Sequence, residues 1–123
     1  MSRVLLNITN HELTEEQKKG WERIINLPEN LKKLWSSIPP DFDCEQVKHY
    51  LTPLLDWISE NKDSSILVAG DFCAFKIVLE HAIAQNIEVF QATTKRETVE
   101  VKNPDGTVVK RSVFKHVKFR KLN

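Results

Sequence analysis

The stretch that decides the fold is Ser65-Ile66-Leu67-Val68-Ala69-Gly70-Asp71-Phe72. Its first five residues form an apolar run typical of a buried strand, and Gly70-Asp71 turns the chain into a helix that we expect to extend to about Gln85. A second apolar run, Ile87–Thr93, follows at once. Strand, turn, helix and strand in this order predict a βαβ unit with a right-handed crossover, which is the building block of a mainly parallel sheet.

The same alternation of strands and helices continues towards the N-terminus. A capping box at Thr14-Glu15-Glu16-Gln17 predicts the start of a short helix that stops near Gly20. Pro53 interrupts the apolar stripe of a later helix and predicts either a kink or two helices, with Thr52 as an N-cap. The other expected elements are strands at 3–8 and 23–27 and helices at 29–37 and from 44 to 61.

The last third of the chain has a different pattern. Asn103-Pro104-Asp105-Gly106 separates two segments rich in valine, and Asp-Gly in that position is a strong signal for a β-hairpin. The return strand runs through Phe119, and its period of two places Lys115 and His116 on opposite faces. The sequence therefore predicts one α/β domain over residues 1–123, with a Rossmann-like, mainly parallel sheet, flanking helices and a C-terminal antiparallel hairpin.

Composition sets limits on the class of protein. The chain has 123 residues, of which 41% are hydrophobic and 28% charged, and no apolar run is long enough to cross a membrane as a helix. No signal peptide is evident, so we expect a cytoplasmic protein. Cys44 and Cys73 lie far from any Cys or His at a metal-ligand spacing. This isolation argues against a zinc site and predicts two reduced, packed thiols.

Charge is distributed unevenly along the chain. Residues 1–90 carry 9 Lys or Arg against 14 Asp or Glu, whereas residues 91–123 carry 9 against 3, so the net charges are −5 and +6. A nearly neutral domain is poorly suited to binding along a long nucleic acid. A basic face at one end suits a small phosphorylated ligand or a short nucleic acid instead.

The familiar catalytic fingerprints are absent from the sequence. There is no GxGxxG or GxxxxGK[ST] loop, no HExxH helix and no GxSxG elbow. We therefore expect no metal and no cofactor. What remains are three polar clusters at strand ends, Thr9-Asn10-His11, Gly70-Asp71-Phe72 and Thr93-Thr94-Lys95-Arg96. A parallel sheet would bring all three to the same edge, where hydroxyl, ammonium and guanidinium donors could meet a phosphate.

Each of these residues also has a structural interpretation. Asp71 is favoured as a helix N-cap, Phe72 as a core residue, and the Thr-Thr-Lys-Arg cluster as a solvated turn. Asn10 and His11 could close a turn, although a loop histidine is equally a plausible acid or base. Lys115 and His116 could be solvated strand residues. The tryptophans fall on apolar helical stripes, which favours core or an oligomer interface.

Taken together and in order, the chain resembles the small stand-alone CRISPR-associated proteins that consist of a single CARF domain. The resemblance is carried by Val4–Thr9 ending in Asn10-His11, Leu13–Gln17, Leu31 through Leu34-Trp35-Ser36 to Ile38-Pro39-Pro40, Ala69–Phe72, Ala92–Glu97 and Ser112–Val117.

The resemblance implies a Rossmann-like homodimer that binds a cyclic oligoadenylate across its two-fold axis. In the ring nuclease members, it implies metal-independent cleavage of that second messenger, which ends a type III CRISPR antiviral response. A sensor or sponge that binds the ring without cutting it is the alternative. The expected catalytic residues are Asn10, His11, Lys95 and Arg96, and the expected ligand-binding residues are Thr9, Asp71, Phe72, Thr93, Thr94, Lys115 and His116.

Overall fold

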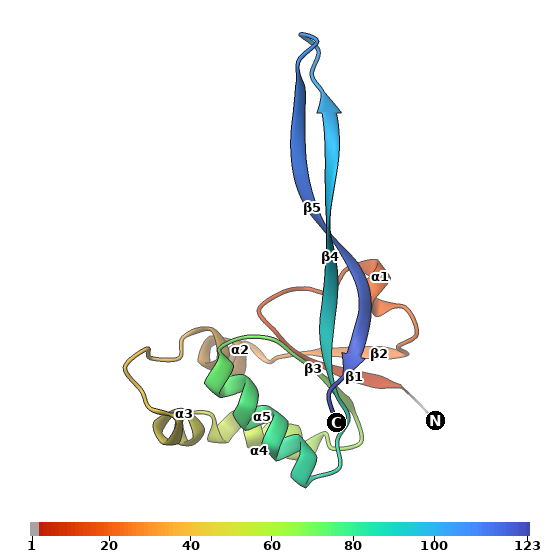
Figure 1. Cartoon of the computed structure of the whole chain (residues 1–123). Coiled ribbons are helices and arrows are strands. Elements are labelled where there is room, and N and C mark those ends of the chain that lie inside the picture. The colour runs from red at the N-terminus through yellow and green to blue at the C-terminus, as the bar shows by residue number, and fades with distance from the viewer. Residues whose placement is uncertain (1–2) are drawn as a thin grey trace.

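A five-stranded mixed sheet is the centre of the structure, a computed structural model that describes residues 3–123 (Figure 1). The strand order is β2-β1-β3-β4-β5, with β1–β4 parallel and β5 antiparallel to β4. The strands are β1 (Val4–Ile8), β2 (Arg23–Asn26), β3 (Ser65–Val68), β4 (Val89–Lys102) and β5 (Val108–Lys121). The expectation of an α/β fold with a parallel sheet and a C-terminal hairpin is confirmed.

Five helices flank the sheet: α1 (Glu15–Lys18), α2 (Glu29–Ser36), α3 (Cys44–Tyr50), α4 (Thr52–Glu60) and α5 (Phe72–Ala84). The capping box that begins α1 is confirmed, because Gln17 N donates to Thr14 Oγ1 and Thr14 N donates to Gln17 Oε1. Pro53 separates α3 from α4 as expected, but Thr52 is the first residue of α4 rather than its N-cap.

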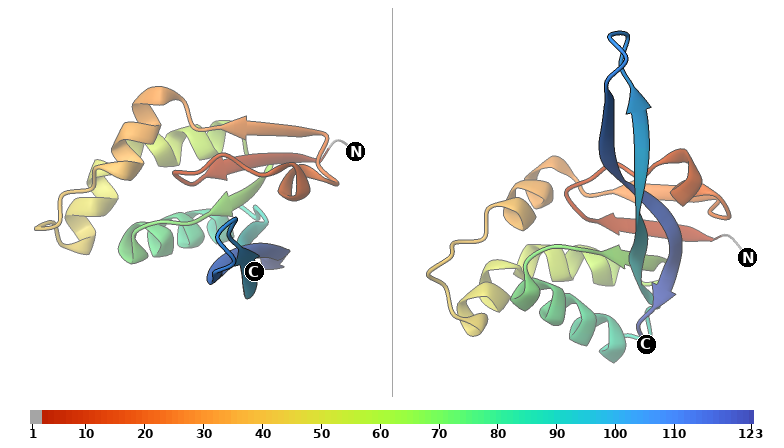
Figure 2. Two further views of the ribbon diagram at one scale, coloured as in Figure 1. Left: turned by 90° about the horizontal axis from the view of Figure 1, so that it is seen from above. Right: turned by 45° about the horizontal axis from the view of Figure 1, so that its top comes forward.

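The two faces of the sheet are covered unequally. Alternate strand residues, among them Leu6, Ile66 and Val89, pack against α2–α5 in the main core. The opposite face, which carries Leu5, Leu67 and Phe90, is covered only by Leu13, Trp21 and Phe119 around the short α1. Figure 2 shows α4 and α5 side by side along one side of the sheet. This second face therefore has no helical layer comparable to α2–α5.

Trp35 and Gly70 form a close contact at the end of β3. The indole Nε1 of Trp35 donates to the carbonyl oxygen of Ala69 at 2.9 Å. A Cβ on residue 70 would lie 2.8 Å from that nitrogen and 2.9 Å from two ring carbons, so only glycine fits. The turn from β3 into α5 is thus fixed by an aromatic ring from α2.

Two further expectations from the sequence are wrong. Cys44 and Cys73 are not free thiols but form a disulfide, because α3 and α5 pack together and bring their Cα atoms to 6.0 Å. Likewise β4 does not end in a polar turn at Thr93. It continues through the cationic cluster to Lys102, because β5 pairs with it along the whole length.

The long β4–β5 hairpin projects well beyond the rest of the molecule (Figure 1). Its turn is the expected one: Gly106 has φ +88°, and Thr107 donates to Asp105 Oδ1 from both its backbone nitrogen and its hydroxyl. These two hydrogen bonds hold the pKa of the Asp105 carboxyl below its ordinary value.

Candidate functional site

A polar cavity lies at the carboxyl ends of β1 and β2. Its volume is about 190 Å³, and it is lined by Asn7, Thr9, His11, Glu12, Asn26, Leu27, Glu29 and Lys32. Open α/β sheets bind ligands outside the carboxyl ends of their strands, so its position is the expected one. Thr9 and His11 belong to the first of the three clusters selected from the sequence.

The floor of the cavity is a buried hydrogen-bond network. Asn7 is 3% exposed and Thr9 7%. Asn7 Nδ2 donates to Asn26 Oδ1 at 3.0 Å and to the carbonyl oxygen of His11 at 2.9 Å. Thr9 Oγ1 lies 2.7 Å from Asn7 Oδ1 and accepts from the His11 backbone nitrogen at 3.2 Å. The network holds the backbone of His11 and leaves its exposed ring free to face a ligand.

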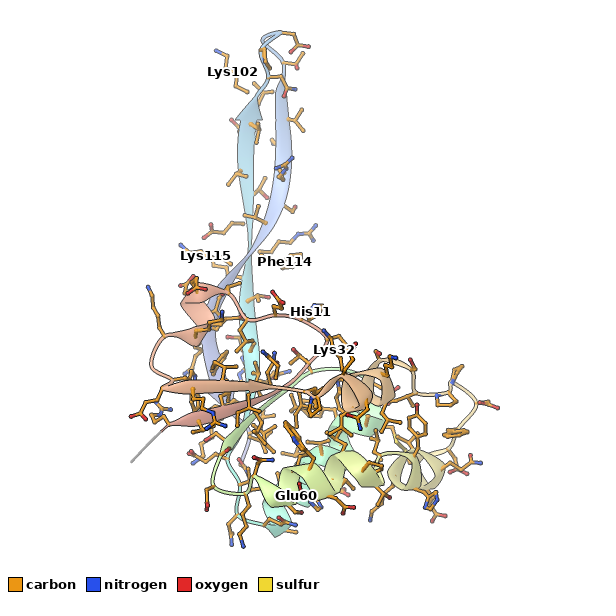
Figure 3. All side chains as sticks on the ribbon, turned by 180° about the vertical axis from the view of Figure 1, so that it is seen from behind. His11, Lys32, Glu60, Lys102, Phe114 and Lys115 are labelled. Atoms are coloured by element: carbon orange, nitrogen blue, oxygen red, sulfur yellow. A yellow bond between two sulfur atoms is a disulfide. The ribbon has the colours of Figure 1, made fainter. Side chains whose placement is uncertain are left out.

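Lys32 supplies the positive charge beside this cavity. It comes from α2, whose N-cap is Pro28, two residues after the end of β2. Figure 3 shows His11 and Lys32 close together on the same side of the molecule. Glu12 and Glu29 also line the cavity, so a phosphate would have to lie nearer Lys32 than these carboxylates.

The register of the sheet divides the residues of the third cluster between two faces. Asn7 pairs with Leu67 and Leu67 with Phe90, so the side chains of Asn7, Thr9 and Phe90 lie on one face of the sheet. Counting along β4 in steps of two from Phe90 places Ala92, Thr94 and Arg96 on that same face. We call it the cavity face.

Thr93 and Lys95 consequently point to the opposite face. Their partners on β5 are Lys118 and Lys115, which share that orientation. Figure 3 agrees, since Phe114, the partner of Arg96, lies on the side of His11 whereas Lys115 lies on the other side of the hairpin. Lys95 and Arg96 were expected to act on one phosphate together, and within one protomer their opposite orientations contradict this.

A β-bulge brings His116 to the cavity face. The ladder pairs Thr93 with Lys118 but Thr94 with His116, so Val117 has no partner. The extra residue turns His116 to the same side as Phe119, and their rings are 5.2 Å apart at 68°. Among the described residues, His116 Nδ1 is a buried side-chain nitrogen without a hydrogen-bond partner. Such an atom requires an explanation, and a ligand acceptor would provide one.

The remaining expected residues divide between structural and exposed positions. Asp71 caps α5 by accepting from Ala74 N at 3.0 Å, as the structural interpretation favoured. Phe72 is 84% exposed, so its assignment to the core is wrong. It stands at the carboxyl end of β3, where an exposed ring could stack on a base. Asn10 is exposed in the loop after β1.

Only Thr9 and His11 among the cavity-lining residues were selected from the sequence, and Asn7, Asn26 and Lys32 are among those missed. The two asparagines interrupt or end otherwise apolar strands, at Leu5-Leu6-Asn7-Ile8 and Ile24-Ile25-Asn26, and they are direct register partners. A polar residue inside a buried strand is the signal that could have identified them. Lys32 had no such signal, because it looks like any exposed lysine on an amphipathic helix.

The structure also bears on metal binding and on membrane insertion. In the part of the chain that the structure describes, no group of three or more His, Cys, Asp or Glu is arranged to hold a metal ion. Residues 3–123 also contain no helix long and apolar enough to span a bilayer.

Comparison with known proteins gives two matches in agreement. A family model described as the uncharacterized protein MJ1673 family matches residues 3–120. The uncharacterized protein MJ1673 of Methanocaldococcus jannaschii is 34% identical over 121 residues, which cover 92% of each chain. No solved structure matches significantly.

Proposed function

The chain belongs to the MJ1673 family, and from the geometry of its cavity face we propose that it is a ring nuclease that binds and cleaves a cyclic oligoadenylate. The preferred substrate is cyclic tetra-adenylate, and its cleavage would switch off a type III CRISPR antiviral response in the cytoplasm. On this proposal the sheet is the Rossmann-like core of a CARF domain. The protein uses neither a membrane nor a long nucleic acid as partner.

One observation carries the proposal. Thr9 and His11 line the cavity, and Thr94, Arg96 and His116 of the hairpin lie on the same face of the sheet. Hydroxyl, imidazole and guanidinium groups at the carboxyl edge of a parallel sheet suit the phosphates of a short nucleotide. The unpartnered Nδ1 of His116 adds a hydrogen-bonding atom that the protein itself leaves unused.

The chemistry that fits these groups is internal attack by a ribose. The 2′-hydroxyl oxygen forms a bond to the adjacent phosphorus while the bond from phosphorus to the 5′-oxygen breaks. The hydroxyl proton goes to a base and the leaving 5′-oxygen takes up a proton, so the product is linear and ends in a 2′,3′-cyclic phosphate. No external water is consumed in this step, and it requires no metal ion.

The position of each residue suggests its role in the proposed reaction. His11, with its backbone fixed by Asn7 and its ring free, is the proposed proton acceptor. Arg96 is the proposed stabiliser of the pentacoordinate phosphorane, with Lys32 as a second cation. Thr9, Thr94 and His116 donate or accept hydrogen bonds at the phosphates, Asn10 helps to position the ribose, and Phe72 offers a surface for an adenine.

The small volume of the cavity supports a dimer. A cavity of about 190 Å³ lies below the range of roughly 300–1,000 Å³ usual for small-molecule sites, and a cyclic tetranucleotide is larger than most such ligands. A homodimer presents the same cavity twice across a two-fold axis, which matches the near symmetry of the ring.

A sensor or sponge is the second candidate, and one observation favours it. Lys95 does not join Arg96 on the cavity face, so one protomer lacks the paired cations expected of a cleaving site. By contrast, the alternative that the tryptophans form an interface with another subunit loses support. Trp35 is 3% exposed, Trp57 packs on the main core, and Trp21 contacts Phe90 and Phe119.

The test is to incubate the purified chain with radiolabelled cyclic oligoadenylates of different ring sizes in EDTA. Cleavage supports the ring nuclease, and retention on a filter without cleavage supports the sponge. If the chain neither binds nor cleaves a ring of any size, both the ring nuclease and the sponge are excluded.

A further inference from the structure

The outer part of the hairpin has one apolar and one polar face. We call residues Glu97–Val113 the arm. The register pairs Val101 with Val109, Val99 with Arg111, and Glu97 with Val113, and all six side chains point to the same side. The opposite side carries the pairs Thr98–Ser112, Glu100–Lys110 and Lys102–Val108, so Val108 is its one apolar residue. We call the four valines 99, 101, 109 and 113 the valine face.

Nothing in the protomer covers the valine face. Val99, Val101 and Val109 are 39%, 40% and 50% exposed. None of the four valines belongs to either hydrophobic cluster of residues 3–123, and the arm stands away from the other elements (Figures 1 and 2). A two-stranded ribbon is only marginally stable alone in water, so an arm of this length with an uncovered apolar face requires a partner.

The partner does not add a strand to the arm. β3 pairs with β4 only at Val89 and Phe90, so both strands of the arm are edge strands. β5 carries Lys110, Arg111, Lys115, Lys118, Arg120 and Lys121, and β4 carries Lys95, Arg96, Glu97, Glu100 and Lys102. Charged side chains, lysine above all, are what natural sheets use to prevent pairing at an edge. The remaining possibility is that the partner packs against a face of the arm rather than along an edge.

Two charged residues on the same side as the valines indicate which partner packs against this face. Glu97 and Arg111 lie on opposite strands two rungs apart, on the same side as the valines. In the described part of the chain neither forms an ion pair with the other. A patch with valines at its centre and one charge of each sign is complementary to itself under a two-fold axis, where each Glu97 meets an Arg111. The face suits a nucleic acid poorly, because it carries four valines and a carboxylate instead of a continuous basic surface.

We infer that the valine face is the dimer interface, and that two copies of the chain pack arm against arm with Glu97 of each facing Arg111 of the other. This contact lies on the side of the ribbon opposite the cavity face. It therefore leaves Arg96 and His116, which lie just below the arm, open to a ligand.

The test measures association of the full-length chain without any nucleotide, by sedimentation equilibrium. We expect a wild-type dimer, and Val101→Lys should raise the dimer dissociation constant at least tenfold. The matched control is Thr98→Lys, which adds the same charge to the polar face of the same arm and should change the constant less than twofold. A monomeric wild type, or equal effects of the two substitutions, would overturn the inference.

A charge exchange provides a second, independent readout that does not depend on the valines. E97R and R111E alone should each weaken the dimer, because like charges then face each other twice. Their equimolar mixture restores both ion pairs and should form a mixed dimer tighter than either variant alone. A mixture no tighter than the separate variants would exclude the arm-to-arm contact. Because no oligoadenylate is present, this result is independent of whether the protein cleaves rings.

Discussion

Lys95 and Lys115 are direct partners across the β4–β5 ladder, so two ammonium groups point to the same side of neighbouring strands. Like charges at such positions destabilise a sheet unless an anion lies between them. Lys95 was selected from the sequence as a catalytic residue that stabilises negative charge, and Lys115 as a ligand-binding residue. Their pairing gives a physical reason for these assignments, although they lie on the face opposite His11.

Replacing one of these lysines should distinguish its effect on hairpin stability from its role in binding an anion. Lys95→Glu converts repulsion into attraction and should stabilise the hairpin by about 0.2–1 kcal/mol, seen as slower amide exchange around residues 93–97. Sulfate should slow exchange there in the wild type and not in the variant. An equal response of both proteins to sulfate would show that no anion binds between the two lysines.

Lys32 should matter more than its neighbour Lys33. A charge-assisted hydrogen bond to phosphate contributes on the order of 1.5–3 kcal/mol, so Lys32→Ala should weaken binding of cyclic tetra-adenylate roughly tenfold or more. Lys33→Ala removes the same charge from the next position of α2 but does not line the cavity. Titration by fluorescence anisotropy compares the two, and equal losses would mean that Lys32 acts only through the overall charge.

Arg96 should stabilise the transition state rather than the bound ring. If it acts as an oxyanion donor, Arg96→Ala should cost on the order of 2–4 kcal/mol in single-turnover cleavage. Lys95→Ala is the matched control, since it removes a cation from the adjacent position on the other face. A near-wild-type rate for Arg96→Ala would remove this residue from the mechanism.

Gly70→Ala should destabilise the fold by roughly 1–3 kcal/mol, because the new Cβ would overlap the Trp35 indole. Urea unfolding measures the loss. In a Trp35→Leu background the ring atoms that clash are absent, and the same change should cost less than half as much. Equal costs in the two backgrounds would place the strain in the backbone of residue 70 instead.

The Cys44–Cys73 disulfide closes a loop with a sequence separation of 29 residues. Loop entropy for that length predicts a contribution of about 3–4 kcal/mol, which reduction or Cys44→Ser should remove. The variant should then unfold identically with and without dithiothreitol, whereas the wild type should not. Identical unfolding of oxidised and reduced wild type would contradict this contribution.

Most of the fold could be predicted from local sequence. Capping at Thr14, the break at Pro53 and the Asp105-Gly106 turn each depend on residues close together in the chain, and all three are confirmed. The disulfide and the length of β4 could not be predicted in this way. Both depend on contacts between distant segments: α3 against α5, and β5 against all of β4.

The candidate site was predictable only in part, for the same reason. Thr9 and His11 follow an apolar strand, so their place at the carboxyl edge could be inferred. His116 could not be placed, because the bulge at Val117 changes which side chains share its face. Without that extra residue, His116 would lie on the opposite side from Phe119.

The most direct test of the central claim is the mass of the product formed from cyclic tetra-adenylate in EDTA under single-turnover conditions. Attack by the 2′-hydroxyl opens the ring without adding water, so the account predicts a linear product isomeric with the substrate and ending in a 2′,3′-cyclic phosphate. A first product that has gained one water, or a ring that stays closed, would contradict it.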